Sequence, residues 1–491
     1  DNANANDNAN DNANDNAKGN TNFLQVSKPN NMTNCMLRFP HLAIQIFNKM
    51  DDKGLVKSRE VTRTWLDFID EKNNLVTPWL RIVQIPTILP SGFTYLHLAA
   101  DHGQTDMFKT MLKKESEKNP KNNDDITPLH RAGLKGNLNI IKILIRYSEK
   151  FKIDFNHTEV QGNTAFHYAC ASGCSSLVAL LVRNCSKLKI NVNASNVFGY
   201  KAFQMACSSN NSSNVNLLIQ MSSKLGIDLG ATDQTGKNAF HTVCELGHSK
   251  IAKILMKNYV KLKLDLNSKD TNGQTAFQLA CEYGHYDVAK MIINKSTQMK
   301  IDLNAKELCS HTAFHLACFY NKPRVAELLV NNSYKHKIDL NSKNVNMLTA
   351  FHMVCQYGHY EVAQVMISNS SQMKIDLNAK DFYGQTAFHL ACRAGNSRVV
   401  ETLLMSSYEH NIDLDSNFNL DTQDLHGQTA LHLACSYGHS KIVEVLIKNY
   451  NECEKRYFEH YINVGYYCDF NVKDNLGQTA FYHACFNGHK D

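Results

Sequence analysis

The sequence contains neither a long apolar run nor a block of like charges. Its longest uninterrupted apolar run is Leu177–Val182, far short of the roughly 20 residues that a membrane-spanning helix needs. The 52 basic and 46 acidic residues are interspersed and leave a net charge of +6, whereas a nucleic-acid-binding protein gathers basic residues on one face. We therefore expect no membrane insertion and no nucleic-acid partner. A basic and then apolar leader is also missing from the first residues, so we expect a cytoplasmic or nuclear location.

The short motifs of common catalytic and metal sites are missing too. No Cys-x-x-Cys pair exists, and Cys170 and Cys174 are too far apart to form one. There is no phosphate-binding loop, no Gly-x-Ser-x-Gly turn and no set of protein-kinase motifs. We therefore expect a non-catalytic protein with no cofactor and no metal site.

What the sequence does have is fifteen cysteines, and most of them share one position in a repeat. Free cysteine behaves as a small and often buried hydrophobic residue. We expect the shared cysteines to fill a core in a reducing compartment, with disulfides or metal binding as the alternatives. The nine are Cys170, Cys207, Cys244, Cys281, Cys318, Cys355, Cys392, Cys435 and Cys485.

The repeat is defined by a phrase that reads Thr-Ala-Phe-His-Leu-Ala-Cys at 386–392. The first spacing between copies is 33 residues, the next seven are each 37, and the last two are 43 and 50. Repetition at such a period indicates a solenoid built from one supersecondary unit. The first residues of the eleven copies are Thr94, Thr127, Thr164, Lys201, Asn238, Thr275, Thr312, Thr349, Thr386, Thr429 and Thr479.

Each copy reads as a turn followed by two short helices. An Asp or Asn and a Gly precede the phrase, which is the chemistry of a turn. The apolar phrase ends at a Gly such as Gly395, and a second apolar stretch at helical spacing follows at 399–404. One such pair buries too little surface to be stable alone, so we expect neighbours to stack and to share one core.

These units resemble the ankyrin repeat, whose phrase is Thr-Pro-Leu-His-x-Ala and which stands unaltered at 127–130. The resemblance covers 91–491 and implies an all-α solenoid of about eleven helix-turn-helix units. The period of 37 exceeds the 33 of the family by about one helical turn. We therefore expect longer outer helices without a Gly at their ends, and the larger insertions at 405–424 and 448–474 to form loops on the same edge. Because the phrase at 479 is followed by only half a unit, we also expect the natural chain to continue.

Two sets of histidines recur along the repeat. The first occupies the fourth position of the phrase, and the second follows the Gly that ends the first helix. Spread one to a unit, neither set can converge on a metal or act as one catalytic base. We interpret both as structural. The first set is His97, His130, His167, His241, His315, His352, His389 and His432, and the second is His248, His285, His359, His439 and His489.

A row of tyrosines occupies the position just before that Gly, at Tyr283, Tyr320, Tyr357 and Tyr437. In ankyrin-like arrays this position and the turn tips line the binding groove. Partly exposed aromatic residues are good anchors for a protein partner. We expect these four to form a partner-binding groove, the alternative being that duplication copied a tyrosine without a function.

The N-terminal part of the chain differs from the repeat. Residues 1–34, which open with an Asp/Asn/Ala tract, are expected to be disordered. Residues 35–76 have the apolar spacing of three short helices, too few to be stable without a partner surface. Residues 77–90 contain three prolines and form a stiff linker to the repeats.

The segment 35–76 contains Phe39-Pro40, Ile46-Phe47, Met50-Asp51, Leu55 and a final Val61-x-x-x-Trp65. This pattern is similar to an F-box, which docks on the Skp-type adaptor of a cullin–RING ubiquitin ligase. Phe39 where the family has Leu is its main departure. The resemblance implies an F-box/ankyrin receptor that presents an unidentified substrate protein to the ligase, as a non-catalytic subunit. The alternatives are a three-helix cap on the solenoid and an ankyrin scaffold without a ligase role. The matching residues expected to contact the adaptor or form the core are Pro40, Leu42, Ile46, Phe47, Leu55, Val61 and Trp65.

Overall fold

The computed structural model describes residues 90–114, 117–409, 420–460 and 469–489, without the side chains of 406–409 and 452–460. The chain divides into two compact units, Asp1–Leu89 and Pro90–Asp491, and all described residues belong to the second. The expected disordered tract, three-helix segment and most of the linker therefore lie outside the described residues.

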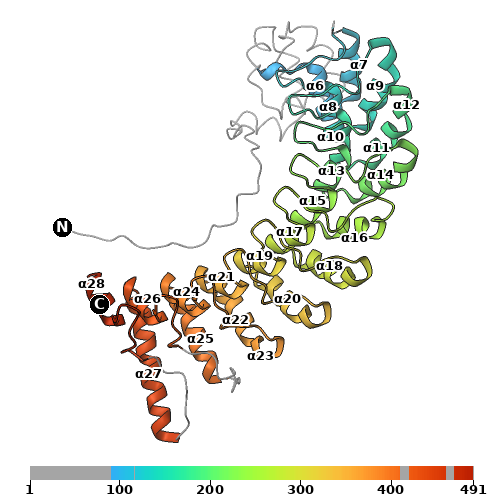
Figure 1. The fold of residues 1–491 in the computed structure, drawn as a ribbon. Helices are drawn as coiled ribbons and strands as arrows, with labels where there is room; N and C mark the ends of the chain where they lie inside the picture. Colours follow the sequence, from blue (N-terminus) through green and yellow to red (C-terminus); the bar gives the residue numbers. More distant parts are fainter. Residues whose placement is uncertain (1–89, 115–116, 410–419, 461–468, 490–491) are drawn as a thin grey trace, which may run out of the picture. The chain divides into compact units, whose positions relative to one another are not determined.

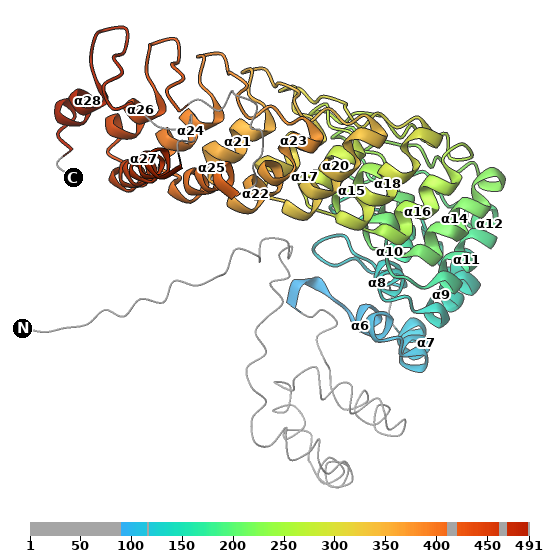
Figure 2. The ribbon, with the colours of Figure 1, turned by 90° about the horizontal axis from the view of Figure 1, so that it is seen from below.

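The described part of Pro90–Asp491 is all-helical, as expected, with 23 α-helices and only isolated β-bridges between them. The helices form two rows that follow the chain (Figures 1 and 2). We call the first helix of each unit the inner helix and the second the outer helix. The inner helices are α6 (Tyr95–His102), α8 (Pro128–Lys135), α10 (Ala165–Ala171), α13 (Ala202–Ser208), α15 (Ala239–Glu245), α17 (Ala276–Glu282), α19 (Ala313–Phe319), α21 (Ala350–Tyr357), α24 (Ala387–Ala394), α26 (Ala430–Ser436) and α28 (Ala480–Phe486). The outer helices are α7 (Thr105–Lys114), α9 (Leu138–Phe151), α11 (Ser175–Arg183) with α12 (Cys185–Leu188), α14 (Ser212–Leu225), α16 (Ser249–Asn258), α18 (Tyr286–Met299), α20 (Pro323–His336), α22 (Tyr360–Ser368) with α23 (Ser370–Met373), α25 (Ser397–Glu409) and α27 (Ser440–His460).

Each inner helix begins directly after the residue that opens the repeat phrase, and this residue caps the helix. At Thr312 the side chain accepts the N–H of His315, while the Thr312 N–H donates to Nδ1 of His315 at 3.3 Å. This reciprocal pair satisfies backbone N–H groups that a helix start leaves without partners. The inner helix α24 ends at Gly395, whose φ of 79° is left-handed, a conformation that glycine adopts without steric cost. The expected turn, helix and glycine stop are confirmed.

The outer helices are longer than the inner ones, as the period predicted. Four of them, α9, α14, α18 and α20, have 14 residues each. In three other units the helix is interrupted or ends at an Asn whose side-chain amide donates to the carbonyl oxygen four residues earlier, a bond that Asn332 also makes within the uninterrupted helix α20. These are Asn184, Asn258 and Asn369.

The insertion expected to loop out at 448–474 instead extends a helix in its first half. Helix α27 runs for 21 residues, to His460. Residues 448–460 contain Glu, Lys and Arg but neither Gly nor Pro, so nothing in them stops a helix. Residues 410–419 and 461–468 lie outside the described residues.

Five outer helices end on a lysine in the left-handed conformation, where a glycine is usual, and in a sixth unit Lys263 adopts it after the turn that follows α16. Lys300 and Lys337 have φ values of 53°, and Gly226 takes the same place in one unit with a φ of 62°. The expectation of no glycine at this position is therefore right in six units. In these units a lysine adopts the left-handed backbone conformation that a glycine usually supplies. The other four lysines are Lys152, Lys189, Lys263 and Lys374.

Consecutive units stack on both rows and share one apolar seam. Each inner helix contacts the next inner helix, and each outer helix contacts the next outer helix. Phe277, Phe314 and Phe351 of successive inner helices are each about 1% exposed. Stacking of this kind is what makes the single helix pair stable.

The shared cysteines fill this seam in seven units, from Cys170 to Cys392, where each is fully buried. Burial raises the pKa of the thiols, Cys281 and Cys318 among them. The core interpretation is wrong for Cys485, which is exposed, and holds in part for Cys435. Both belong to the last two units, where the seam runs out of neighbouring helices in the described chain.

Candidate binding surface

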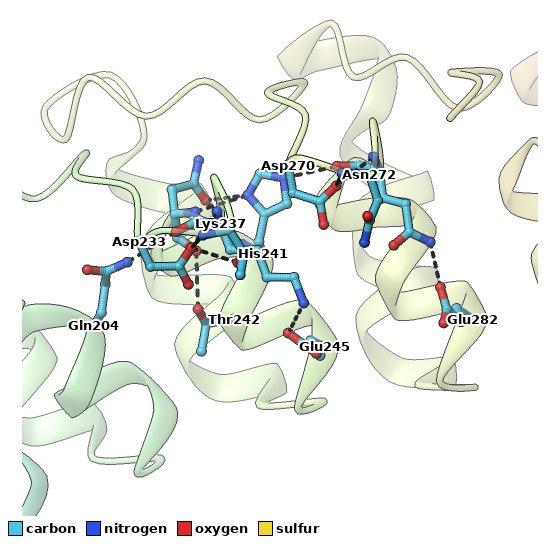
Figure 3. Close-up of polar contacts among 12 residues, drawn as sticks. Gln204, Asp233, Lys237, His241, Thr242, Glu245, Asp270, Asn272 and Glu282 are labelled. Carbon is cyan, nitrogen blue, oxygen red and sulfur yellow. Dashed lines mark hydrogen bonds and ion pairs between the residues drawn. The ribbon is translucent and has the colours of Figure 1, made fainter. Parts of the chain in front are cut away.

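The first set of histidines ties each inner helix to the following unit. His241 lies in α15; its Nδ1 pairs with the side chain of Asn238, and its Nε2 lies 3.0 Å from the Ser268 carbonyl oxygen of the next unit (Figure 3). Burial lowers the pKa of His241, and the pKa of His315 falls to about 4 for the same reason. These rings are neutral, buried and hydrogen-bonded, and the structural interpretation is confirmed.

The second set links each unit to the preceding one. Nε2 of His285 lies 2.8 Å from the Glu245 carbonyl oxygen, and Nε2 of His359 lies 2.8 Å from that of Phe319. Asn396 makes the equivalent bond in another unit. These histidines connect the start of an outer helix to the end of the previous inner helix by a hydrogen bond, so their role too is structural.

The four tyrosines lie at the C-terminal ends of the inner helices and are about half exposed, at 47%, 45%, 51% and 58% in chain order. Tyr283, Tyr320 and Tyr357 belong to three consecutive units. Tyr437 lies two units beyond Tyr357, with Ala394 in the position between. The structure thus brings three of the four into one row and sets the fourth apart.

Neighbouring side chains fix the tyrosine rings. Tyr283 stacks on His285 of the second histidine set, with ring centroids 6.3 Å apart. Tyr320 and Tyr357 each meet the ring of Phe319 edge-on at 4.9 Å. Burial, together with the facing carboxylate of Glu245, raises the pKa of Tyr283. Rings held in this way lose little freedom when a partner binds.

The carboxylates that face two of the tyrosines are themselves held. Lys237 Nζ lies 2.8 Å from Glu245, and Gln274 Nε2 donates to Glu282 at 2.6 Å (Figure 3). Glu282 in turn faces Tyr320. Burial is the largest cause of the raised pKa of Tyr320, and the charge of Glu282 is the second. Each carboxylate therefore connects the turn of its own unit to the tyrosine of the next.

The turn between units forms a finger, which we define as the residues from the capping acid or amide to the residue before the phrase. In one finger Asp270 Oδ1 accepts the N–H groups of Asn272 and Gln274, both at 2.9 Å (Figure 3). The tips are joined by backbone bonds, as where the Leu425 N–H donates to the Tyr383 carbonyl oxygen at 3.0 Å. The fingers therefore form a ladder and not a set of separate loops.

Large apolar side chains stand exposed on these tips, and sequence reasoning missed them. Two adjacent fingers in the middle of the array have polar tips, at 234–235 and 271–272. The signal was present in the sequence, since an apolar pair inside a polar turn is unusual. The exposed apolar tips are Val160, Val197, Phe198, Leu308, Val345, Met347, Phe382, Tyr383, Leu425 and Leu476.

One finger carries a group of side chains that could hold a metal ion, the single such group among the described residues. The ligand atoms of Glu307, Cys309 and His311 lie within 4.8 Å of one another. Glu307 already accepts the N–H groups of Cys309 and His311, and His311 Nδ1 lies 2.8 Å from it. The amide Nδ2 of Asn344 is 3.1 Å from His311 Nε2, which makes Nε2 the acceptor and places the proton on Nδ1. With Nδ1 protonated, the group is a turn cap in which Glu replaces Asp.

The predicted adaptor-binding residues Pro40, Leu42, Ile46, Phe47, Leu55, Val61 and Trp65 lie outside the described residues. None of the described helices combines the length and apolar character that crossing a membrane requires.

A family model described as ankyrin repeats (3 copies) matches seven overlapping segments: 72–159, 96–196, 149–231, 202–307, 258–344, 314–417 and 380–457. Together they span 72–457, well over half of the chain. No curated protein matches. Among solved structures, the ankyrin repeat domain of Bcl-3, described as a unique member of the IkappaB protein family, is 20% identical with a TM-score of 0.41, covering 50% of this chain and 99% of that one.

Proposed function

This chain belongs to the ankyrin-repeat family, whose members bind proteins and are typically non-catalytic. From that premise we propose that the surface formed by its inner helices and fingers captures a substrate protein for a ubiquitin ligase. The capturing surface is the row of Tyr283, Tyr320 and Tyr357, with Tyr437 two units beyond it, together with the apolar finger tips.

The observation that carries the capture role is a set of exposed aromatic rings fixed by their neighbours. Tyr320 and Tyr357 flank Phe319 on two consecutive inner helices. The fingers of the same region carry Leu308 and Phe382, which are 72% and 68% exposed. Rigid aromatic and aliphatic anchors of this kind supply most of the binding energy in protein interfaces.

The capture role is tested with the full chain as bait in an interaction screen, followed by a double variant. Tyr320→Ala with Tyr357→Ala is expected to weaken capture of the identified partner at least about tenfold, while the melting temperature changes little. Tyr334→Ala is the matched control, because Tyr334 is 94% exposed on the outer helix α20. Capture that survives the double variant unchanged would contradict the proposal.

The ligase part of the proposal rests on the sequence segment 35–76. Its pattern of Pro40, paired apolar residues and a final Val-x-x-x-Trp matches an F-box. Three short helices bury too little surface to be stable without a partner, and the Skp-type adaptor of a cullin complex would supply that surface. The residues proposed to dock or to support docking are Pro40, Leu42, Ile46, Phe47, Leu55, Val61 and Trp65.

A pull-down with a purified Skp-type adaptor tests the ligase part separately. The full chain is expected to bind the adaptor, and a Pro40→Ala/Trp65→Ala variant is expected to lose binding. If both proteins fail to bind, the second candidate function holds, an ankyrin scaffold without a ligase role. The specific feature that favours this alternative is that the family model matching this chain is one of ankyrin repeats, and its matches span 72–457.

A further inference from the structure

Four consecutive units carry a lysine directly before the capping acid or amide of the finger. The same position holds Thr or Ser in the three units before them and Gln423 in the unit after. Three of the lysines are exposed and Lys343 is partly buried. We call these four residues the lysine row: Lys269, Lys306, Lys343 and Lys380.

Each lysine of the row is tied to the following unit. Lys269 Nζ donates to the Lys306 carbonyl oxygen at 2.7 Å, and Lys306 Nζ donates to that of Lys343 at 3.0 Å. Lys343 and Lys380 make the same bond to the carbonyl oxygens of Lys380 and Gln423. The four side chains are therefore ordered along the array, and each ammonium group keeps two of its three N–H donors for other acceptors.

The charge of the lysine row has no counterpart in the described part of the chain. None of its four ammonium groups forms an ion pair with a carboxylate there. The adjacent acids accept N–H groups of their own turns, as Asp270 does from Asn272 and Gln274. Glu307 and Asp381 are engaged in the same way. A row of ordered positive charges without carboxylate partners is complementary to a partner of negative charge.

Three fingers of the row also carry exposed apolar side chains. Leu308, Val345 and Phe382 each follow a lysine of the row by two residues, and they are 72%, 60% and 68% exposed. A partner that matches these fingers combines acidic with apolar side chains.

The spacing of the units restricts the shape of the partner. The inner helices of successive units contact one another, and packed helices lie about 8–10 Å apart, so the lysines recur at about that interval. An extended chain rises about 3.3 Å per residue, so that every third side chain recurs at about 10 Å. Lysine is a compact point charge, whereas the fork of arginine matches phosphate. An extended segment with regularly spaced carboxylates therefore fits the row.

We propose that the lysine row binds an extended acidic segment of the captured protein, with a carboxylate at every third residue and apolar residues between. Each carboxylate accepts a hydrogen bond from one lysine, and the apolar side chains contact Leu308, Val345 and Phe382. The inference rests on the capture role proposed for the finger tips, and it names the chemistry of the segment that they capture.

The probe is a labelled, end-capped peptide of four Glu-Val-Ser repeats. Fluorescence anisotropy with the full chain is expected to show saturable binding that weakens as salt is added, because salt screens exposed charges. A peptide of four Gln-Val-Ser repeats is expected not to bind. A peptide of the same composition with its four Glu residues adjacent is expected to bind at least about threefold more weakly, because fewer ion pairs can form at once.

Chain variants locate the site. Lys306→Gln with Lys343→Gln is expected to weaken binding of the Glu peptide about fivefold, because two exposed ion pairs are lost. The matched control is Lys300→Gln with Lys337→Gln. It removes equal charge from the same two connecting segments, at exposed left-handed positions after the outer helices, and is expected to bind normally. Melting temperatures show whether both variants keep the fold.

Four results would overturn the inference: no saturable binding, equal binding of the Gln peptide, equal binding of the peptide with adjacent Glu residues, or an equal loss in the two lysine pairs. An oligonucleotide that binds the row more tightly than the Glu peptide would also overturn it, because the row would then be a phosphate site.

The same peptide separates this inference from the capture role of the tyrosines. Binding that depends on Lys306 and Lys343 supports the lysine row even where Tyr320→Ala with Tyr357→Ala leaves capture unchanged. A Glu peptide that fails to bind overturns the row alone, because the tyrosine variants are tested on the partner from the interaction screen.

Discussion

Each histidine of the inner helices satisfies hydrogen bonds in two units at once. At His315, Nδ1 accepts the Thr312 N–H, so the proton of the neutral ring lies on Nε2 and is donated to the Leu348 carbonyl oxygen of the next unit at 3.2 Å. All three groups are buried or nearly so. Removing the ring would leave the buried Thr312 N–H without a partner, while the Leu348 carbonyl oxygen would keep only the hydrogen bond from the Asn344 N–H.

Glutamine takes over this role in two units. Gln278 Oε1 accepts the Thr275 N–H at 2.9 Å, and its Nε2 donates to the Ala305 and His311 carbonyl oxygens. Since the amide offers the same acceptor and donor as a neutral imidazole, the chain itself contains the conservative variant.

His315→Gln is therefore expected to stay within about 1 kcal/mol of the parent stability. His315→Leu is expected to lose about 1–3 kcal/mol, because the leucine leaves the Thr312 N–H unpaired and removes one of the two hydrogen bonds of the Leu348 carbonyl oxygen. Urea unfolding followed by circular dichroism measures both variants. Equal stability of the two would show that the ring fills space and that its hydrogen bonds contribute little.

The same histidines make stability depend on pH. Burial lowers the pKa of His97, His130 and His315 to about 4, whereas the unfolded chain has a value near 6.5. Between these values the unfolded state binds more protons than the folded state. The stability contributed by each ring is thus complete above about pH 6.5 and is lost as the pH falls toward 4.

We expect the urea midpoint to be nearly constant above pH 7 and to fall steadily from pH 6.5 to 5. Each of these three rings contributes at most roughly 2 kcal/mol to this change, since one proton accounts for about 1.4 kcal/mol per pH unit. A variant with His130→Gln and His315→Gln should show a shallower decline, since it has two fewer shifted groups. A midpoint that does not move between pH 7.5 and 5 would contradict the neutral buried rings.

At the scale of the element, the residues after each outer helix connect neighbouring units along the outer edge. The side chain of Asn304 donates to the Lys337 carbonyl oxygen and accepts the Asp339 N–H, both at 2.8 Å. Lys337 is the left-handed residue that ends α20. Asn267 makes the same two bonds one unit earlier. The extra residues of the 37-residue period thus build an asparagine ladder.

Asn304→Ala is expected to lower stability by about 1–2 kcal/mol, because two hydrogen bonds at an exposed edge are lost. Asn304→Asp keeps the acceptor and loses the donor, so it should fall between the parent and the alanine variant. Thermal unfolding gives the order, and hydrogen exchange at the Asp339 amide reports the local bond. The ladder would have no energetic role if the alanine variant matched the parent in both measurements.

At the scale of the molecule, a unit contacts only its neighbours along the described rows. Stability in such an array is a sum of unit and interface contributions, and opening can be local. Six of the seven fully buried seam thiols report this opening, because they lie one to a unit in six successive units. These are Cys170, Cys207, Cys244, Cys281, Cys318 and Cys355.

Labelling with a thiol reagent at neutral pH is expected to modify the exposed Cys309 and Cys485 rapidly. The six seam thiols should react only as their units open, because burial both covers them and raises their pKa, and the thiolate is the reactive form. Mass spectrometry at increasing urea would then give an order of opening. Rapid labelling of Cys281 and Cys318 in the native protein would contradict a continuous seam.

The sequence by itself determined the repeat, the class of fold and the local chemistry of each unit. Thr312 and His315 lie three residues apart, and Gly395 stands at the end of its phrase. These signals act over a few residues, so the sequence shows them directly. The two rows of histidines were correctly interpreted because a ring in every unit of a row cannot converge with the others.

Only the tertiary structure decided which side chains are exposed. Tyr357 and Cys355 lie two residues apart in one helix, yet one is half exposed and the other fully buried. The apolar finger tips and the extension of α27 depended on it as well. Burial is set by neighbours that are about 37 residues away in the chain and a few ångströms away in space. In a repeated sequence the same residue types recur in every unit, whether or not such a neighbour covers them.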